Sequence, residues 1–396
     1  MKKNLEKIIT LKSKAIRVIY ISSYIPRRCG IATYTKDLTN AINLLNPHAL
    51  AEIMAVTKPE DKIDYPWEVK FKIDQDELES YLQAALYINQ SGADLISLQH
   101  EFGIFGGNCG EYIIPLVESI KKPLITTLHT VIDDSNSYYG MILKRLIKKS
   151  KAVIVMMKQI KEKLIKDYGA LSNKIVVIPH GAPDLPQSPT EEYKKKKNLN
   201  GKIVLGNINL LSKDKGIEYA LEAVSLIKEK YPNVLYLVIG QTHPVVLKNE
   251  GEKYRNFLEE KIKKLKIEKN VIFINKYLSL DELIEWLKTI DIYITPYLNP
   301  QQSASGALAY AIGCGKPCIS TPYLYAKEVL SCGRGILIPF RDAKSIAKSV
   351  FFLWENPEKR KEIEKKAYAY GRLMTWPNVA LKHLELFRLI LTSNEK

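Results

Sequence analysis

The stretch IVLGNINLLSKDKGIEYALEAV, residues 203–224, contains the unit from which the whole fold is predicted. Its first part, IVLGNI, is a short β-branched and apolar run that ends in a polar turn, which indicates a buried strand. Its last part, GIEYALEAV, carries apolar residues at the spacing of one helix face. A strand that leads directly into a helix is the repeating unit of a parallel α/β sheet.

The same alternation of strand and helix patterns continues through most of the chain. Further strands are predicted at residues 15–22, 52–56, 69–73, 93–99, 124–129, 152–157, 175–179, 234–240, 271–275, 290–297, 317–323 and 335–340. Residues 182–202 interrupt the alternation with prolines and a run of lysines, which indicates a linker between two domains. The expected fold class is therefore α/β, with two Rossmann-like, doubly wound parallel sheets.

The charge of the chain predicts anionic partners. Lys and Arg number 59 against 43 Asp and Glu, so the formal net charge is +16. Nucleic acid is the least favoured partner, because zinc-finger spacing, RNP-like motifs and interleaved basic and aromatic residues are absent from the sequence. The Lys-rich segment 142–166 has apolar residues at helical spacing (Ile142, Leu143, Leu146 and Ile147). This segment is either an ordinary solvated helix or a helix that rests a basic, apolar face on an anionic membrane.

The sequence favours a cytoplasmic location. Residues 1–20 mix Lys and Glu and lack the apolar core of a secretory signal. An uncharged run at residues 292–315 is long enough to span a membrane, but its Pro, Asn, Gln and Ser residues argue against insertion. The five Cys have neither CxxC nor Cys/His zinc spacing, so free thiols in a reducing compartment are expected.

Candidate binding residues of the first half follow the ends of predicted strands, where parallel sheets bind ligands. The loop after the first strand carries Arg28, Gly30 and Ile31 immediately before a helix, which lets an anion approach the backbone amides. The next candidates are His100 and Glu101 in LQHEFGIFGG and His129 in TLHT. Because HExxH spacing and a carboxylate cluster are absent, these side chains are expected to hydrogen-bond a hydroxyl-rich substrate rather than a metal.

Candidate residues of the second half suit an anion. Lys213 and Lys215 lie on a turn before a helix, so an ammonium group and helix amides can bind one phosphate together. The loop after strand 290–297 leads to a second helix start, whose first-turn residues would be Ser303, Ser305 and Gly306. Small, uncharged side chains there would let a diphosphate reach the helix amides.

Taken together, these stretches make the chain resemble the family 4 glycosyltransferases of GT-B architecture over nearly its whole length. The resemblance rests on PRRCGIATYTKDL, TLHT, IVVIPHG, KDKGIEYALEAV, GALAYAIGCGKPCIST, EVLSCGRGILIPFRDAKSIAKSV and WPNVALKHLELF. It implies two domains that face a central cleft: an acceptor domain of residues 1–190, to which a helix in residues 375–396 returns, and a donor domain of residues 198–374. It also implies transfer of a hexosyl group, mannose or glucose, from a nucleoside-diphosphate sugar to a saccharide or lipid-linked acceptor, with retained configuration.

The resemblance also assigns roles to residues. His129 and Lys215 would be catalytic, and Arg28, His100 and Glu101 would bind the acceptor. The donor would be bound by Gly30, Ile31, Lys213, Lys215, Gln302, Ser303, Ser305, Gly306, Tyr310 and Glu328. No metal and no resident cofactor are expected, and GDP-mannose is preferred over UDP-glucose as the donor.

The sequence departs from the family pattern around Gln302 and Tyr310, in the stretch that the resemblance assigns to donor binding. The family commonly has two Glu residues separated by seven others, and Gln302 and Tyr310 stand in those places. The Arg that commonly precedes the phosphate-binding Lys is replaced by Leu210. Two alternatives therefore stay open: a non-catalytic protein that binds sugar nucleotides or glycans, and a phosphorylase or epimerase of the same fold.

Overall fold

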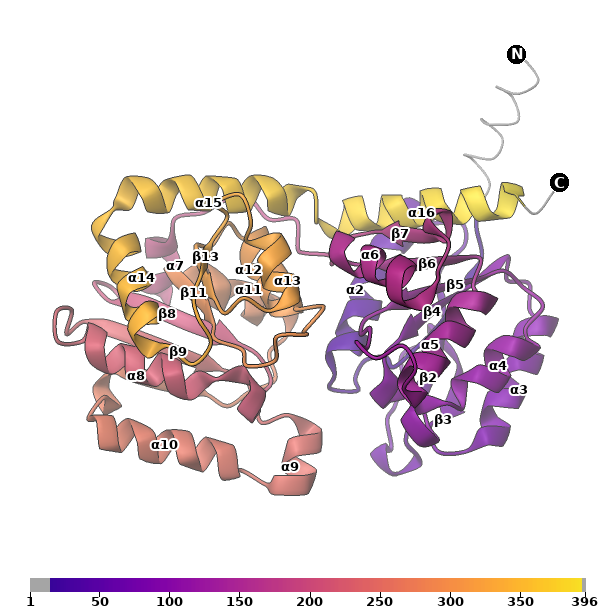
Figure 1. Cartoon of the computed structure of the whole chain (residues 1–396), viewed down its shortest axis with the longest axis horizontal. Coiled ribbons are helices and arrows are strands. Elements are labelled where there is room, and N and C mark those ends of the chain that lie inside the picture. Colours follow the sequence, from indigo (N-terminus) through magenta and orange to yellow (C-terminus); the bar gives the residue numbers. More distant parts are fainter. Residues whose placement is uncertain (1–14, 394–396) are drawn as a thin grey trace, which may run out of the picture. The chain divides into compact units, whose positions relative to one another are not determined.

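The structure is a computed structural model that describes residues 15–393, and these form two parallel sheets of seven and six strands flanked by helices (Figure 1). The chain divides into two compact units, residues 1–181 with 376–396 and residues 182–375. Every strand predicted from the sequence is present, so the α/β class with two Rossmann-like sheets is confirmed. Residues 1–14, most of the stretch whose composition argues against a secretory signal, lie outside the described residues. No helix within residues 15–393 has the length and apolarity needed to cross a bilayer.

The sheet of the first unit has the strand order β3-β2-β1-β4-β5-β6-β7, with all neighbours parallel. The strands are β1 (Val18–Ser22), β2 (Glu52–Thr57), β3 (Val69–Asp74), β4 (Leu95–His100), β5 (Leu124–Leu128), β6 (Ala152–Val155) and β7 (Ile175–Val177). The helices are α2 (Gly30–Leu45), α3 (Leu78–Gln90), α4 (Ile113–Ser119), α5 (Tyr138–Lys149), α6 (Lys158–Tyr168) and α16 (Trp376–Ser393). The order of the strands reverses between β1 and β4, and such a reversal is where a doubly wound sheet binds ligands.

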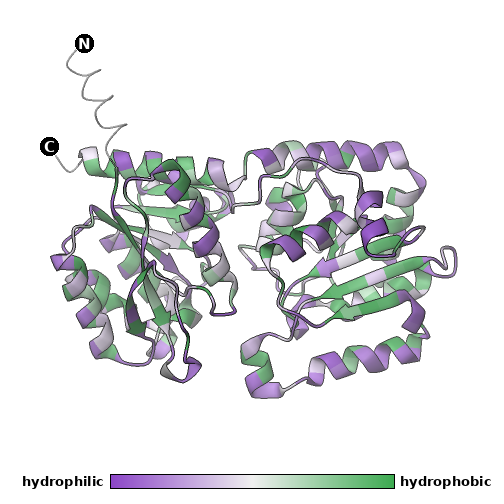
Figure 2. Cartoon of the chain, turned by 180° about the vertical axis from the view of Figure 1, so that it is seen from behind, coloured by the Kyte–Doolittle hydropathy of each residue, from purple (hydrophilic) through white to green (hydrophobic). Residues whose placement is uncertain are grey.

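Burial explains why these apolar runs form strands. Every residue of β1 and β4 is buried, as expected for central parallel strands covered by helices on both faces. Figure 2 shows the same distribution, with apolar residues concentrated in the strands and polar residues on the outer faces of the helices.

Helix α16 completes the first unit from the far end of the sequence. It packs against α2 and buries Val379, Leu384 and Phe387. Gly181, the last residue before the chain leaves the unit, lies against the ring of Trp376. A Cβ atom on Gly181 would lie 2.1 Å from that ring, so only glycine fits there.

The apolar residues predicted to face a membrane in segment 142–166 are instead part of the core of the first unit. Ile142, Leu143, Leu146 and Ile147 are buried on the inner face of α5. Strand β6 also divides the segment, so that α5 and α6 are separate helices. The apolar membrane face was therefore a wrong prediction, because helical spacing cannot distinguish a stripe that faces a core from one that faces lipid. Membrane contact through the exposed lysines alone stays a prediction.

The sheet of the second unit has the strand order β10-β9-β8-β11-β12-β13, again with all neighbours parallel. The strands are β8 (Ile203–Ile208), β9 (Val234–Ile239), β10 (Val271–Ile274), β11 (Ile292–Thr295), β12 (Cys318–Ser320) and β13 (Ile336–Leu337). The helices are α7 (Thr190–Lys196), α8 (Ile217–Ile227), α9 (Pro244–Glu250), α10 (Lys253–Leu265), α11 (Leu280–Thr289), α12 (Gly306–Gly313), α13 (Leu324–Val329), α14 (Ala343–Glu355) and α15 (Pro357–Arg372). In this sheet the reversal of strand order falls between β8 and β11.

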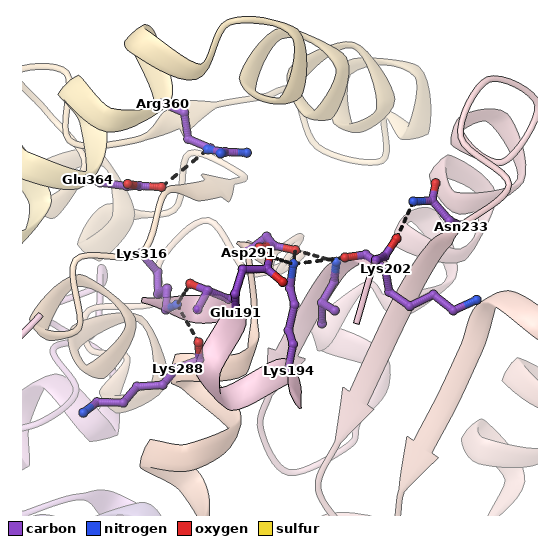
Figure 3. Close-up of polar contacts among 12 residues, drawn as sticks. Glu191, Lys194, Lys202, Asn233, Lys288, Asp291, Lys316, Arg360 and Glu364 are labelled. Atoms are coloured by element: carbon purple, nitrogen blue, oxygen red, sulfur yellow. Dashed lines mark hydrogen bonds and ion pairs between the residues drawn. The ribbon is translucent and has the colours of Figure 1, made fainter. Parts of the chain in front are cut away.

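Helix α7 lies within the segment 182–202 that the sequence indicates as a linker, and it packs against α11 in the second unit. Lys194 of α7 is only 1% exposed, and its ammonium lies 2.7 Å from Asp291 and 2.8 Å from Glu191 (Figure 3). Burial raises the pKa of Asp291, and the nearby charge of Lys194 opposes that rise. This buried ion pair joins α7 to the residue that precedes β11.

Helix α12 is held at its carboxyl end by close contacts within the second unit. A Cβ atom on Gly371 of α15 would lie 2.8 Å from Cα of Gly313, so the two glycines let the helices approach closely. Just after α12, the ammonium of the buried Lys316 donates to the carbonyl of Lys288 at 3.0 Å and to the hydroxyl of Thr190 at 3.0 Å (Figure 3). Burial lowers the pKa of Lys316 to about 8.

Candidate functional site

In the second unit, the turn after β8 and the loop after β11 are in contact at the reversal of strand order. Gly216 has φ of +62°, and a Cβ atom there would lie 2.2 Å from the carbonyl oxygen of Pro296. The amide of Leu298 donates to the carbonyl of Asp214 at 2.8 Å. Backbone contact of this kind, which only glycine permits at residue 216, fixes the turn of Lys215 beside the loop that leads to α12.

Lys215 is placed and partly neutralised by its neighbours. Its ammonium lies 2.7 Å from the carboxylate of Asp214 and 4.6 Å from the ring centroid of Tyr297, and its side chain is 17% exposed. Burial alone would raise the pKa of Asp214, but the charge and hydrogen bond of Lys215 hold that pKa below its ordinary value. An ammonium has three N–H donors, so the pair with Asp214 leaves capacity for an anion.

The amino end of α12 follows from the same loop. Ser305 is the N-cap residue, and its hydroxyl accepts from the amide of Leu308 at 3.3 Å. The side chains of Ser303 and Ser305 are buried, whereas Gln302 and Gly306 are partly exposed. The first amides of a helix have no partner within the helix. Tyr297 lies in the loop that leads to this helix start, and its ring centroid lies 4.6 Å from the Lys215 ammonium.

The other residues of this unit that were predicted to bind the donor make contacts of their own. Lys213 is 71% exposed and pairs with Glu250 of α9 at 3.3 Å. Gln302 donates its side-chain amide to the carbonyl of Ala304 at 3.0 Å. Tyr310 lies on the buried side of α12.

Glu328 lies on α13, whose first residues hydrogen-bond the loop between β11 and α12. The amides of Leu324 and Tyr325 donate to the carbonyls of Pro300 and Gln302 at 3.0 and 3.1 Å. The structure therefore places the Lys215 turn in contact with the loop that leads to Ser305 and Gly306. The donor roles of all these residues stay predictions.

In the first unit, the loop after β1 ends in an accessible helix start. Gly30 is the first residue of α2, and the thiol of Cys29 caps the helix by accepting from the amide of Ala32 at 3.3 Å. Arg28 and Gly30 are exposed, Ile31 is partly exposed, and a Cβ atom on Gly30 would meet nothing within 4 Å. Space for a ligand therefore exists beside these amides.

His129 follows β5 and is held on two sides. Its Nε2 atom lies 3.1 Å from Oε1 of Gln99, and its ring centroid lies 4.7 Å from that of Tyr34 in an edge-to-face arrangement. Burial lowers the pKa of His129 to about 3, and the neighbouring His180 and His100 contribute in the same direction. The imidazole is therefore neutral at physiological pH.

His100 and Glu101, the predicted acceptor residues at the end of β4, are engaged inside the protein. The His100 ring is 0% exposed between Phe102 and Phe105, and neither of its nitrogens has a hydrogen-bond partner among residues 15–393. Glu101 accepts from the hydroxyl of Thr130 at 2.6 Å and from the amide of Phe102 at 3.0 Å. An acceptor cannot reach the His100 ring in this conformation, and both acceptor roles stay predictions.

Residues 15–393 contain no group of three or more His, Cys, Asp or Glu side chains arranged to hold a metal ion. The groups that the two sites offer to a ligand include hydrogen-bonding side chains, helix amides and the Lys215 ammonium.

Four residues of these sites were missed in the sequence. Asp214 could have been identified, since it is adjacent to Lys215, and Tyr297 could have been identified at the end of its strand. Gln99 and Tyr34 lie inside stretches already selected, LQHEF and GIATYTKDL. Nothing in the sequence alone shows that both residues contact His129.

Comparisons with known proteins match the two units to glycosyltransferase family models. A family model described as "Glycosyl transferases group 1" matches residues 189–370, and a model described as "Glycosyltransferase Family 4" matches residues 63–184. No curated protein sequence matches the chain.

Solved structures resemble the chain over nearly its whole length. Anabaena HepE in complex with UDP and glucose has a TM-score of 0.74 at 15% identity, covering 94% of this chain and 99% of that chain. Sucrose-phosphate synthase from Thermosynechococcus elongatus has a TM-score of 0.76 at 17% identity, covering 96% and 100%. A structure described as "Trehalose-6-phosphate from E. coli bound with UDP-2-fluoro glucose" has a TM-score of 0.69 at 13% identity, covering 94% of this chain and 99% of that chain. At such low identities the likeness shows the fold alone.

Proposed function

We propose that the chain is a GT-B glycosyltransferase of the family 4-like type, which the two family models support. It transfers a hexosyl group, mannose or glucose, from a nucleoside-diphosphate sugar to a saccharide or lipid-linked acceptor. The observation that carries this proposal is the contact between the Lys215 turn and the loop before α12. It places an ammonium and a helix amino end at the reversal of strand order, where doubly wound sheets bind phosphate groups.

The donor diphosphate is held by Lys215 and by the amides at the start of α12. Negative charge develops on the diphosphate as the glycosidic bond breaks, and groups fixed in advance around that charge lower the barrier. Asp214 keeps Lys215 in place before the donor arrives, since the two side chains are 2.7 Å apart. Ser305 caps the helix with its hydroxyl and leaves the earlier amides directed toward the ligand.

His129 hydrogen-bonds the transferred sugar as a neutral imidazole. Its low pKa, caused mainly by burial, makes it unsuited to supply a proton at physiological pH. We propose retention of configuration, with the leaving phosphate taking the proton of the acceptor hydroxyl, and no metal ion in the step.

Two donors are proposed for the test. The resemblance favours GDP-mannose, whereas two similar structures contain UDP or a UDP-sugar. The family's ribose-binding Glu is replaced by Tyr310, which lies on the buried side of α12. Measured binding of each nucleotide therefore decides which base the donor carries.

The decisive experiment is thermal unfolding of the protein with a panel of nucleoside diphosphates and their sugars. A ligand at 100 times its dissociation constant adds about 2.7 kcal/mol to the free energy of unfolding. We expect Lys215→Ala to abolish the shift produced by the preferred donor. Lys230→Ala is the matched control, because that lysine lies in the same unit, is 58% exposed and pairs with Glu355, away from the predicted donor residues. A full shift in Lys215→Ala would remove Lys215 from the site.

Turnover separates transfer from the alternatives. Release of nucleoside diphosphate that depends on an added acceptor supports the transferase. Binding without turnover would instead support a sugar-nucleotide-binding protein, which the replacement of both family Glu residues by Gln302 and Tyr310 favours. Activity on phosphate and oligosaccharide without nucleotide would indicate a phosphorylase.

A further inference from the structure

A row of buried polar side chains lies on one face of the first sheet and ends at His129. Ser97 and Gln99 are two residues apart on β4, so their side chains share one face of the strand. Gln99 pairs in register with Thr127 of β5, two residues before His129. Ser97 and Gln99 are completely buried, and the proposed mechanism uses neither of them.

The Gln99 side chain lies between Ser97 and His129, with its amide nitrogen toward Ser97 and its amide oxygen toward His129. Its Nε2 atom donates to the hydroxyl of Ser97 at 3.2 Å, which leaves Oε1 facing the His129 ring. That oxygen lies 3.1 Å from Nε2 of His129. A carbonyl oxygen can only accept, so the Nε2 atom of His129 must carry the proton.

The plane of the ring is fixed from another direction. Tyr34 of α2 meets His129 edge to face with centroids 4.7 Å apart, and the same tyrosine ring contacts His180 at 5.0 Å and Trp376 at 5.2 Å. Titratable groups close to His129 include Tyr34 from α2, His180 from the segment after β7 and His100 from the end of β4. None of these is an acid that would favour an imidazolium ion.

We propose that Gln99, oriented by Ser97, is a positioning residue that holds His129 as a neutral imidazole with its proton on Nε2. This inference rests on the proposed function, in which His129 contacts the transferred sugar. A ring with one fixed tautomer presents one defined pattern of donor and acceptor to a sugar hydroxyl, whereas a ring free to exchange tautomers does not. Gln99 is thus a determinant of catalysis that does not touch the substrate.

Three variants test this role. Gln99→Met keeps approximately the volume of the side chain and removes its amide. Gln99→Glu keeps an acceptor atom beside Nε2 and adds a negative charge, which should raise the pKa of His129. Ser97→Ala removes only the partner that orients Gln99, so it tests the same point if the other two variants do not fold. The matched control is Ser150→Ala, which breaks a buried hydrogen bond of 2.7 Å with Thr126 of the same sheet but has no contact with His129.

The direct readout is the tautomer of His129, measured by long-range proton–nitrogen correlation in protein labelled with ¹⁵N-histidine. The chain has six His, so the signals of His129 can be assigned with His129→Gln. In the wild type we expect a protonated Nε2 and an unprotonated Nδ1. In Gln99→Met we expect loss of this preference, and in Gln99→Glu its retention with a higher pKa. Ser150→Ala should leave the signals unchanged.

The kinetic readout distinguishes positioning from general loss of structure. Gln99→Met should lower kcat by up to about tenfold, and by no more than His129→Gln does, because it acts only through the hydrogen bond that His129 makes. The affinity for nucleoside diphosphate alone should not change, because Lys215 and α12 bind it. Gln99→Glu should recover much of kcat at neutral pH and gain a new acidic limb in its pH profile.

Two results would overturn the inference: a proton on Nδ1 in the wild-type protein, or unchanged His129 signals and turnover in Gln99→Met. Failure of the proposed function is a separate result. If His129→Gln kept full turnover, the sugar contact would be wrong, while the measured tautomer would still decide whether Gln99 orients the ring.

Discussion

The two reversals of strand order, β1/β4 in the first unit and β8/β11 in the second, have the same topology but different chemistry. At the first, neutral and buried side chains gather, with His129 held by Gln99 and Tyr34. At the second, the side chains are small, and the interacting groups are the Lys215 ammonium and the backbone at the start of α12. The same position in the two sheets thus carries two different sets of chemical groups, and we propose that each suits a different part of the donor.

The difference follows from what each ligand group requires. Sugar hydroxyls both donate and accept, so neutral groups with fixed geometry can distinguish them without the cost of a buried charge. A diphosphate is anionic and accepts only, so it is matched by a cation and by amide donors that the fold supplies. The following predictions test this division, starting with the largest effect.

Lys215→Ala should have the largest effect on catalysis. Removing one preorganised group that stabilises developing charge lowers kcat by about 10²- to 10³-fold. Steady-state kinetics with the preferred donor would measure this loss. If the positive charge of residue 215 stabilises the diphosphate, Lys215→Arg should keep part of the wild-type kcat, whereas Lys215→Gln should not.

Gly216→Ala should have the largest effect on stability. The residue has φ of +62°, and the added Cβ would lie 2.2 Å from the carbonyl of Pro296. A strained backbone residue costs about 1–3 kcal/mol, and the clash adds to that. Urea unfolding measures the loss. Gly201→Ala is the control, because Gly201 has φ of +69° with open space around it. Equal losses in the two variants would contradict the close contact between the turn and the loop.

The two units should respond to different pH ranges. The buried His129 and His180 have pKa values lowered to about 3 and about 4, so the unfolded chain binds more protons than the folded chain only below about pH 6.5. Above about pH 6.5 both histidines are neutral in the folded and the unfolded chain, so they no longer lower the free energy of unfolding. Lys316 has a folded pKa of about 8, below its ordinary value of 10.5, because burial disfavours its charge. Between these two values the unfolded chain binds more protons, so this contribution to stability rises with pH.

Lys316→Met isolates that rise. The charged or titratable groups around Lys316 are Cys314, Asp291, Glu364 and Lys194, and they remain in the variant. The unfolding free energy of the wild type should gain about 1–2 kcal/mol over that of the variant between pH 8 and pH 9.5. Urea unfolding at several pH values measures the difference, and a constant difference would show that Lys316 does not titrate in this range.

His129→Gln should have the smallest effect of the four. A neutral hydrogen bond contributes about 0.5–1.5 kcal/mol, so kcat should fall by up to about tenfold. Titration with nucleoside diphosphate should show unchanged affinity. Weaker nucleotide binding in this variant would contradict the division of tasks between the two sites.

The strands could be predicted from the sequence, because buried parallel strands leave β-branched runs such as VIYIS and VLYLVI. Helix α7 could not. Its stabilising residue, Lys194, stands in a run of four lysines that look equivalent until Asp291, far away in the sequence, is known to lie beside one of them. The apolar face of α5 was misread for a similar reason, since spacing does not reveal what covers a helix.

The candidate site could be predicted where its residues are local in the sequence. Lys215, Ser305 and Gly306 precede or start helices, and that position is visible in a single stretch. The support of His129 depends instead on the register of β4 against β5 and on the face of α2 that carries Tyr34. Both are properties of the packed sheet, so Gln99 and Tyr34 become visible only in the structure.

The return of α16 to the first unit has a consequence for the order in which the protein is made. The second unit is one continuous piece of chain, residues 182–375, whereas the first needs α16 (Trp376–Ser393) to cover α2. On the ribosome, the unit that is translated first must therefore wait with an apolar helix face uncovered while the later unit can already fold. Nascent chains released before residue 376 should consequently depend on chaperones more than the full-length protein does.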